Sequence, residues 1–173
     1  MKDFITLPVL VISVFLGIWA LGTHSWIVYD VAGTTRFGLI YICIQFLNLK
    51  DEEFCEEFNS PSFWVASFIF IIIGLCLDIG FLILLILSRW HHSSEKLARL
   101  VGVTAMAAFY CAAILFPCGF GADEIGGEPY KLPPTASIGY SFFLFYASLI
   151  LLTMVVFFYS WSIIRRIVLR DIR

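Results

Sequence analysis

The chain has 173 residues, of which 61% are hydrophobic and only 14% are charged, and its mean hydropathy is +0.94. A soluble domain is about half apolar and about one quarter charged, so this composition predicts a single-domain integral membrane protein. The net charge of −2 is uninformative about nucleic acid, but the sequence has no basic cluster with interleaved aromatic residues, so we do not expect a nucleic-acid-binding protein. We therefore expect membrane lipid and other membrane proteins as partners, and no nucleic acid.

Four apolar segments are long enough to cross a membrane as helices. A span needs about 18 or more apolar residues, and the segments cover residues 5–23, 63–88, 100–120 and 138–164. They are continuous rather than alternating, which favours helices over the strands of a barrel. The expected fold is an all-α membrane protein, a bundle of four transmembrane helices that forms one domain over residues 1–173.

The first apolar segment has an alternative interpretation as a cleaved signal peptide. Ala20 and Gly22 are the small residues that a cleavage site needs. The segment before the apolar run carries little positive charge, with Lys2 followed by Asp3, and the run itself is long for a signal peptide. We therefore favour a retained helix.

Lysine and arginine residues predict the orientation of the four helices. Eight of the eleven fall on one side of the predicted spans: Lys2, Arg89, Lys96, Arg99, Arg165, Arg166, Arg170 and Arg173. The positive-inside rule places these residues and both termini in the cytosol, so that loops 24–62 and 121–137 face outward. The expected location is the plasma membrane, with the ciliary membrane and internal membranes as alternatives.

The first outer loop has the composition of a small disulfide-stabilised sheet. Residues 26–29 and 37–47 are rich in β-branched and aromatic residues and predict two strands, with a turn at residues 32–34. Cys43 and Cys55 share the oxidising side of the membrane and are close enough in sequence to form a disulfide. Such a bridge would stabilise the loop by about 3 kcal/mol. The alternative is a pair of free outward thiols.

These residues also carry a resemblance to a known superfamily. Trp26, Gly38, Leu39, Cys43 and Cys55 match the spacing of the motif in the first outer loop of claudin-like tetraspan proteins. The resemblance implies a claudin-like fold, in which a small extracellular β-sheet lies on the four-helix bundle. Two features depart from it: Ile40 stands where a second Trp is usual, and the chain ends in Arg173 rather than in a scaffold-binding hydrophobic tail.

The second outer loop resembles the modulator of smoothened family, also called attenuator of hedgehog. The similar stretches are Leu-Phe-Pro at residues 115–117, Gly-Phe at 119–120 and Glu-Ile-Gly-Gly-Glu-Pro-Tyr-Lys-Leu-Pro at 124–133. Glycines permit a tight turn there and prolines restrict its flanks, which predicts a preordered segment, and one hypothesis is a partner surface formed by Gly126, Gly127, Tyr130, Lys131 and Pro133. The alternative is a structural cap on the first-loop sheet.

Asp78 is the only formal charge in the middle of a predicted span. A carboxylate at the centre of a transmembrane helix costs about 2.5–3.5 kcal/mol. One hypothesis is an ion or proton site, or a bond to the transmembrane helix of a partner. We favour a protonated carboxyl that bonds to a polar side chain of a neighbouring helix, because no second charge lies in the spans.

The sequence contains no pattern of catalytic, metal-binding or phosphate-binding residues, so we expect neither enzymatic activity nor a cofactor. The family resemblance implies a regulator that lowers surface levels of the receptor Smoothened and thereby dampens Hedgehog signalling. It also implies two partners, a large single-span protein with EGF repeats and a ubiquitin ligase. The alternatives are a claudin-type adhesion or paracellular protein and an auxiliary subunit of a channel.

Overall fold

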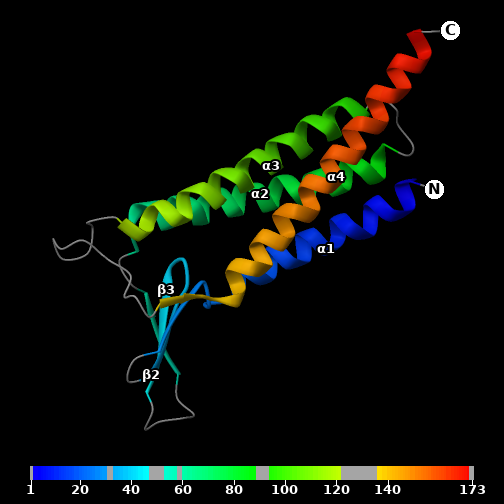
Figure 1. Cartoon of the computed structure of the whole chain (residues 1–173). Coiled ribbons are helices and arrows are strands. Elements are labelled where there is room, and N and C mark those ends of the chain that lie inside the picture. The colour runs from blue at the N-terminus through cyan, green and yellow to red at the C-terminus, as the bar shows by residue number, and fades with distance from the viewer. Residues whose placement is uncertain are drawn as a thin grey trace.

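The structure of the chain is a computed structural model that describes residues 2–30, 33–46, 53–57, 60–88, 94–121 and 136–171. Four long helices and a small antiparallel sheet make up these residues (Figure 1). The helices are α1 (Lys2–Gly22), α2 (Ser62–Leu87), α3 (Ser94–Cys118) and α4 (Tyr140–Asp171). They run as two pairs, α2 beside α3 and α1 beside α4.

The four predicted helices are present, and three of them are longer than the apolar segments: α1, α3 and α4. The third begins at Ser94 rather than at residue 100, because residues 95–99 (Glu-Lys-Leu-Ala-Arg) are good helix formers although three of them are charged. The fourth continues through its basic end to Asp171. By length and composition, α2, α3 and the Tyr140–Trp161 part of α4 are able to cross a membrane, whereas the described apolar part of α1, Thr6–Gly22, is shorter.

The sheet lies at one end of the bundle and is larger than predicted. Its strands are β1 (Ile27–Asp30), β2 (Gly33–Phe37), β3 (Tyr41–Phe46), β4 (Glu53–Glu57) and β5 (Ala136–Ile138), in the order β4-β3-β2-β1-β5. The strand predicted over residues 37–47 is present as β3, but it begins at Tyr41 rather than at residue 37, because a turn at Gly38 separates it from β2, which ends at Phe37. A two-stranded sheet is marginal in water, and the additional strands with a shared apolar face provide the missing stability.

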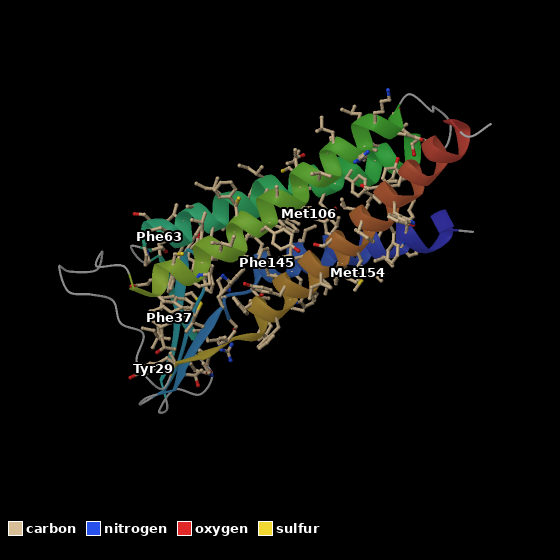
Figure 2. All side chains as sticks on the ribbon, turned by 45° about the horizontal axis from the view of Figure 1, so that its top comes forward. Tyr29, Phe37, Phe63, Met106, Phe145 and Met154 are labelled. Atoms are coloured by element: carbon tan, nitrogen blue, oxygen red, sulfur yellow. A yellow bond between two sulfur atoms is a disulfide. The ribbon has the colours of Figure 1, made fainter. Side chains whose placement is uncertain are left out.

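The sheet and the bundle share one hydrophobic core. Trp26, Ile27 and Leu39 from the outer loop are buried in the same cluster as the helix residues. Figure 2 shows Phe145 of α4 inside the bundle and Phe37 of β2 where the sheet meets the helices. The small sheet therefore packs on a core that the helices supply.

Glycines allow the closest contacts within the α2–α3 pair. A side chain at Gly74 would collide with the ring of Phe109, and one at Gly102 would lie 3.1 Å from the ring of Phe81. In each of the two helices, an aromatic ring from the other helix therefore packs directly against a glycine. Such contacts over small residues are typical of closely packed helix pairs in membrane proteins.

Candidate functional site

Trp26 fixes the sheet to the helices. Its side chain is 1% exposed, and its indole Nε1 donates a hydrogen bond to the carbonyl oxygen of Ala20 in α1 at 3.1 Å. The indole lies 5.0 Å from the ring of Phe116 on α3 and 5.6 Å from the ring of Phe145 on α4. Trp26, which directly precedes β1, thus contacts α1, α3 and α4 and holds the sheet in a defined position.

Gly38 and Leu39 form the turn between β2 and β3. The amide of Gly38 donates to the carbonyl oxygen of Tyr41 at 2.8 Å. A Cβ at position 38 would lie 3.1 Å from that oxygen and 3.4 Å from the Cα of His24, so the turn has little room for a side chain. Leu39 is buried in the core, and Ile40 packs against it. These motif residues therefore contribute through packing that positions the sheet.

The predicted disulfide between Cys43 and Cys55 is present and joins β3 to β4. The two residues lie directly opposite each other in the antiparallel register. Two positions away, the hydroxyl of Tyr41 donates to Oε1 of Glu57 at 3.2 Å. That hydrogen bond and the negative charge of Glu57 raise the pKa of Tyr41. Two cross-strand links therefore fix the register of β4.

The second outer loop returns to the first through β5 and Gly139. The amide of Gly139 donates to the carbonyl oxygen of Trp26 at 2.9 Å, and the amide of Ser141 donates to that of Ser25 at 3.1 Å. A Cβ at Gly139 would overlap the carbonyl oxygen of Ser25 and lie 2.6 Å from its carbonyl carbon. Gly139 was not among the predicted site residues, and its one signal in the sequence is a glycine at the predicted start of the last helix.

A second tryptophan, Trp64 of α2, is also missing from the predicted site residues. It is fully buried, its ring stacks on that of Phe116 at 5.6 Å, and its Nε1 donates to the carbonyl oxygen of Phe116 at 3.2 Å. That carbonyl belongs to the last turn of α3, where the helix itself offers no donor. Trp64 therefore closes the end of the α2–α3 pair where α2 begins and α3 ends.

Asp78 lies inside the bundle and is 0% exposed. Its Oδ2 is 3.4 Å from the hydroxyl oxygen of Ser13 in α1. Ser13 in turn donates to the carbonyl oxygen of Ser148 in α4 at 3.0 Å, and the hydroxyl of Ser148 donates to the carbonyl oxygen of Ser13 at 2.8 Å. The enclosure of Asp78 by helices of its own chain disfavours the hypothesis of a bond to a partner's helix.

The donors around Asp78 are too few for an ionised carboxylate. Each serine hydroxyl has one proton to donate. Ser148 donates its proton to the carbonyl oxygen of Ser13. The hydroxyl of Ser13 lies closer to the carbonyl oxygen of Ser148, at 3.0 Å, than to Oδ2 of Asp78, at 3.4 Å, so its proton goes to Ser148. The buried Oδ1 of Asp78 has no hydrogen-bond partner among the described residues. A neutral carboxyl that donates from Oδ2 to Ser13 gives every proton an acceptor. The geometry therefore favours a structural link between α1, α2 and α4.

The predicted partner surface lies outside the described residues. This applies to all its members: Gly126, Gly127, Tyr130, Lys131 and Pro133. Within the described ranges, no group of three or more His, Cys, Asp or Glu side chains is placed to hold a metal ion. What the structure defines is thus the sheet end of the bundle, with Trp26 and Gly139 at its base and β4 at its edge.

A family model described as Attenuator of Hedgehog matches residues 23–164. The match begins directly after α1, includes all five strands and ends within α4. It therefore covers the first outer loop as well as the second, although the resemblance noted in the sequence was concentrated in the second loop.

Proposed function

Because the chain belongs to the Attenuator of Hedgehog family, we propose that it is a non-enzymatic membrane protein that attenuates Hedgehog signalling. The family match over residues 23–164 is the observation that carries this proposal. The proposed effect is a lower surface level of a signalling receptor, with Smoothened as the receptor. The proposed mechanism is binding to partner proteins and includes no catalytic step.

In the proposed arrangement all four helices cross the plasma membrane and the sheet faces outward, as in claudin-like proteins. Three helices have the length and apolarity for this, and α1 has 21 residues. The start of α1 and the end of α4 lie at the same end of the bundle, opposite the sheet, as an even number of spans requires (Figure 1). The excess of Lys and Arg at that end favours a cytosolic location.

The outer face is the proposed region of contact with partners. Trp26 and Gly139 connect both outer loops to one sheet, so a partner meets a surface that is already ordered. Preordering lowers the entropy that is lost on binding. By family resemblance, the proposed partners are a large single-span protein with EGF repeats and a ubiquitin ligase, which would remove the receptor from the surface.

Deletion of the gene in Hedgehog-responsive cells tests the proposal. Surface Smoothened, measured by biotinylation, and Hedgehog target transcripts should both rise, and re-expression of the wild-type chain should reverse both changes. Rescue with Tyr130→Ala/Lys131→Ala should fail at normal surface expression, whereas Asp123→Asn/Glu124→Gln in the same loop should rescue. An unchanged receptor level and unchanged signalling in the deleted cells would refute the proposed function.

A claudin-type adhesion or paracellular function is the second candidate, and the motif of Trp26, Gly38 and Leu39 with its sheet favours it. Expression in cells that lack junction strands separates the two functions. The regulator proposal predicts no strands at cell contacts and unchanged ion permeability across a monolayer. Strands or altered permeability would favour adhesion, and altered gating of a co-expressed channel would favour an auxiliary subunit.

A further inference from the structure

Strand β4 is one of the two edge strands of the described sheet, at the edge opposite β5. In the order β4-β3-β2-β1-β5 it pairs with β3 alone. Its residues from Phe54 to Glu57 are all exposed, and the ring of Phe54 is 55% exposed. An edge strand presents backbone groups on which a strand of another protein is able to pair.

The register shows which backbone groups point outward. In antiparallel sheets, opposite residues with Cα atoms about 4.5 Å apart form the pair that exchanges no backbone hydrogen bonds, whereas the bonded pairs are about 5.5 Å apart. The Cα atoms of Cys43 and Cys55 are 4.1 Å apart. The N–H and C=O of Cys55 therefore point away from β3, and so do those of Glu53 and Glu57, two residues on either side.

This edge is held in place before any partner arrives. The disulfide fixes Cys55 to β3, and the bond from Tyr41 to Glu57 fixes the end of the strand. A strand with a fixed register loses little conformational entropy when a second strand pairs with it. The edge is therefore suited to strand addition, a recognition mode in which backbone bonds give affinity and side chains give specificity.

Charge determines which strand fits. Three of the five residues of β4 are acidic, Glu53, Glu56 and Glu57. Antiparallel pairing of two copies centred on Cys55 would place Glu57 of each copy opposite Glu53 of the other, and like charges directly opposite destabilise a pair. A second copy of this chain is thus a poor occupant, and a basic strand is a favourable one.

We propose that β4 binds an extended basic segment of a partner protein by antiparallel strand addition. Lys or Arg of that segment lies opposite Glu53, Glu56 and Glu57, and an apolar residue lies opposite Phe54. The inference specifies a contact for the proposed regulatory function and rests on it. The test measures peptide binding to the purified protein. A negative result would therefore refute the strand-addition site without refuting the proposed effect on surface Smoothened.

The probe follows from the register. The peptide Thr-Lys-Lys-Thr-Val-Lys-Thr, laid antiparallel, places lysines opposite Glu57, Glu56 and Glu53, threonine opposite Cys55 and valine opposite Phe54. Its fluorescein conjugate is titrated with the full chain in lipid nanodiscs, and anisotropy reports binding. We expect the basic peptide to bind, and its binding to weaken as the NaCl concentration rises. We expect no binding by a control peptide in which each Lys is replaced by Glu. Absence of binding by the basic peptide would overturn the proposal.

Two comparisons separate strand addition from simple charge attraction. Proline in place of the peptide's central threonine keeps the charge but removes the N–H that faces Cys55, and should abolish binding. In the protein, Glu56→Gln/Glu57→Gln should weaken binding about tenfold through the loss of two cross-strand charge pairs, whereas Asp123→Asn/Glu124→Gln should not. Equal binding of the proline peptide, or an equal loss in the control variant, would contradict a site on β4. Intact mass confirms the disulfide in each variant.

Discussion

Replacement of Gly139 by alanine tests the claim that both outer loops form one sheet fixed to the bundle. Gly139 lies between β5 and α4, and its amide hydrogen bonds to the carbonyl oxygen of Trp26. An added Cβ would overlap the carbonyl oxygen of Ser25, which is backbone and cannot rotate away. The two segments must therefore separate, or the substitution must be accommodated by a shift of the start of α4.

The expected loss of stability follows from the contacts that such a separation breaks. Two backbone hydrogen bonds cross this junction, from Gly139 to Trp26 and from Ser141 to Ser25, and each contributes about 0.5–1.5 kcal/mol. Overpacking adds about 1–3 kcal/mol. A total of about 4 kcal/mol corresponds to a fall in Tm of roughly 8–16 °C for a chain of this size.

The assay is thermal unfolding of the purified protein in detergent, followed by intrinsic tryptophan fluorescence, which reports on the buried Trp26 and Trp64. Gly22→Ala is the matched control, because a Cβ at Gly22 meets nothing within 4 Å. We expect a Tm near that of the wild type for Gly22→Ala and a clearly lower one for Gly139→Ala. Equal Tm values for the two variants would refute the described junction.

Two further predictions concern the disulfide and the buried carboxyl. Cys43→Ser should leave one alkylatable outer thiol at Cys55, lower stability by about 3 kcal/mol and reduce surface delivery; intact mass with and without reductant and surface biotinylation measure this. Asp78→Asn keeps a neutral donor toward Ser13 and should fold with a Tm close to the wild type, whereas Asp78→Lys places a new charge among buried groups and should fail to yield monodisperse protein. A large Tm loss in Asp78→Asn would show that the ionised form is required.

The helices were predictable because each depends on a local property, a long apolar run. The sheet was only partly predictable, since pairing depends on distant segments. Strand β5 has three residues, too few for a composition signal, and it pairs with β1 from the other outer loop. The turn at Gly38 was obscured because apolar residues continue on both sides of it.

The site shows the same division between local and distant determinants. The pairing of Cys43 with Cys55 followed from shared topology and short separation, and it is present. Ser13 as the neighbour of Asp78 was not predictable by name, because several apolar segments carry serine or threonine and only helix packing selects among them. Trp64 gave no signal either, since tryptophan near the end of an apolar segment is also typical of lipid interfaces.

Acute removal of the protein tests the proposed regulation of Smoothened most directly. A degron fused to the chain in Hedgehog-responsive cells allows its depletion, while surface-biotinylated Smoothened is chased over the following hours. The account predicts that the half-life of surface Smoothened lengthens before target transcripts rise, and that degron-resistant wild-type protein prevents the change. An unchanged half-life after complete depletion, or a transcript response that precedes any change in the receptor, would contradict it.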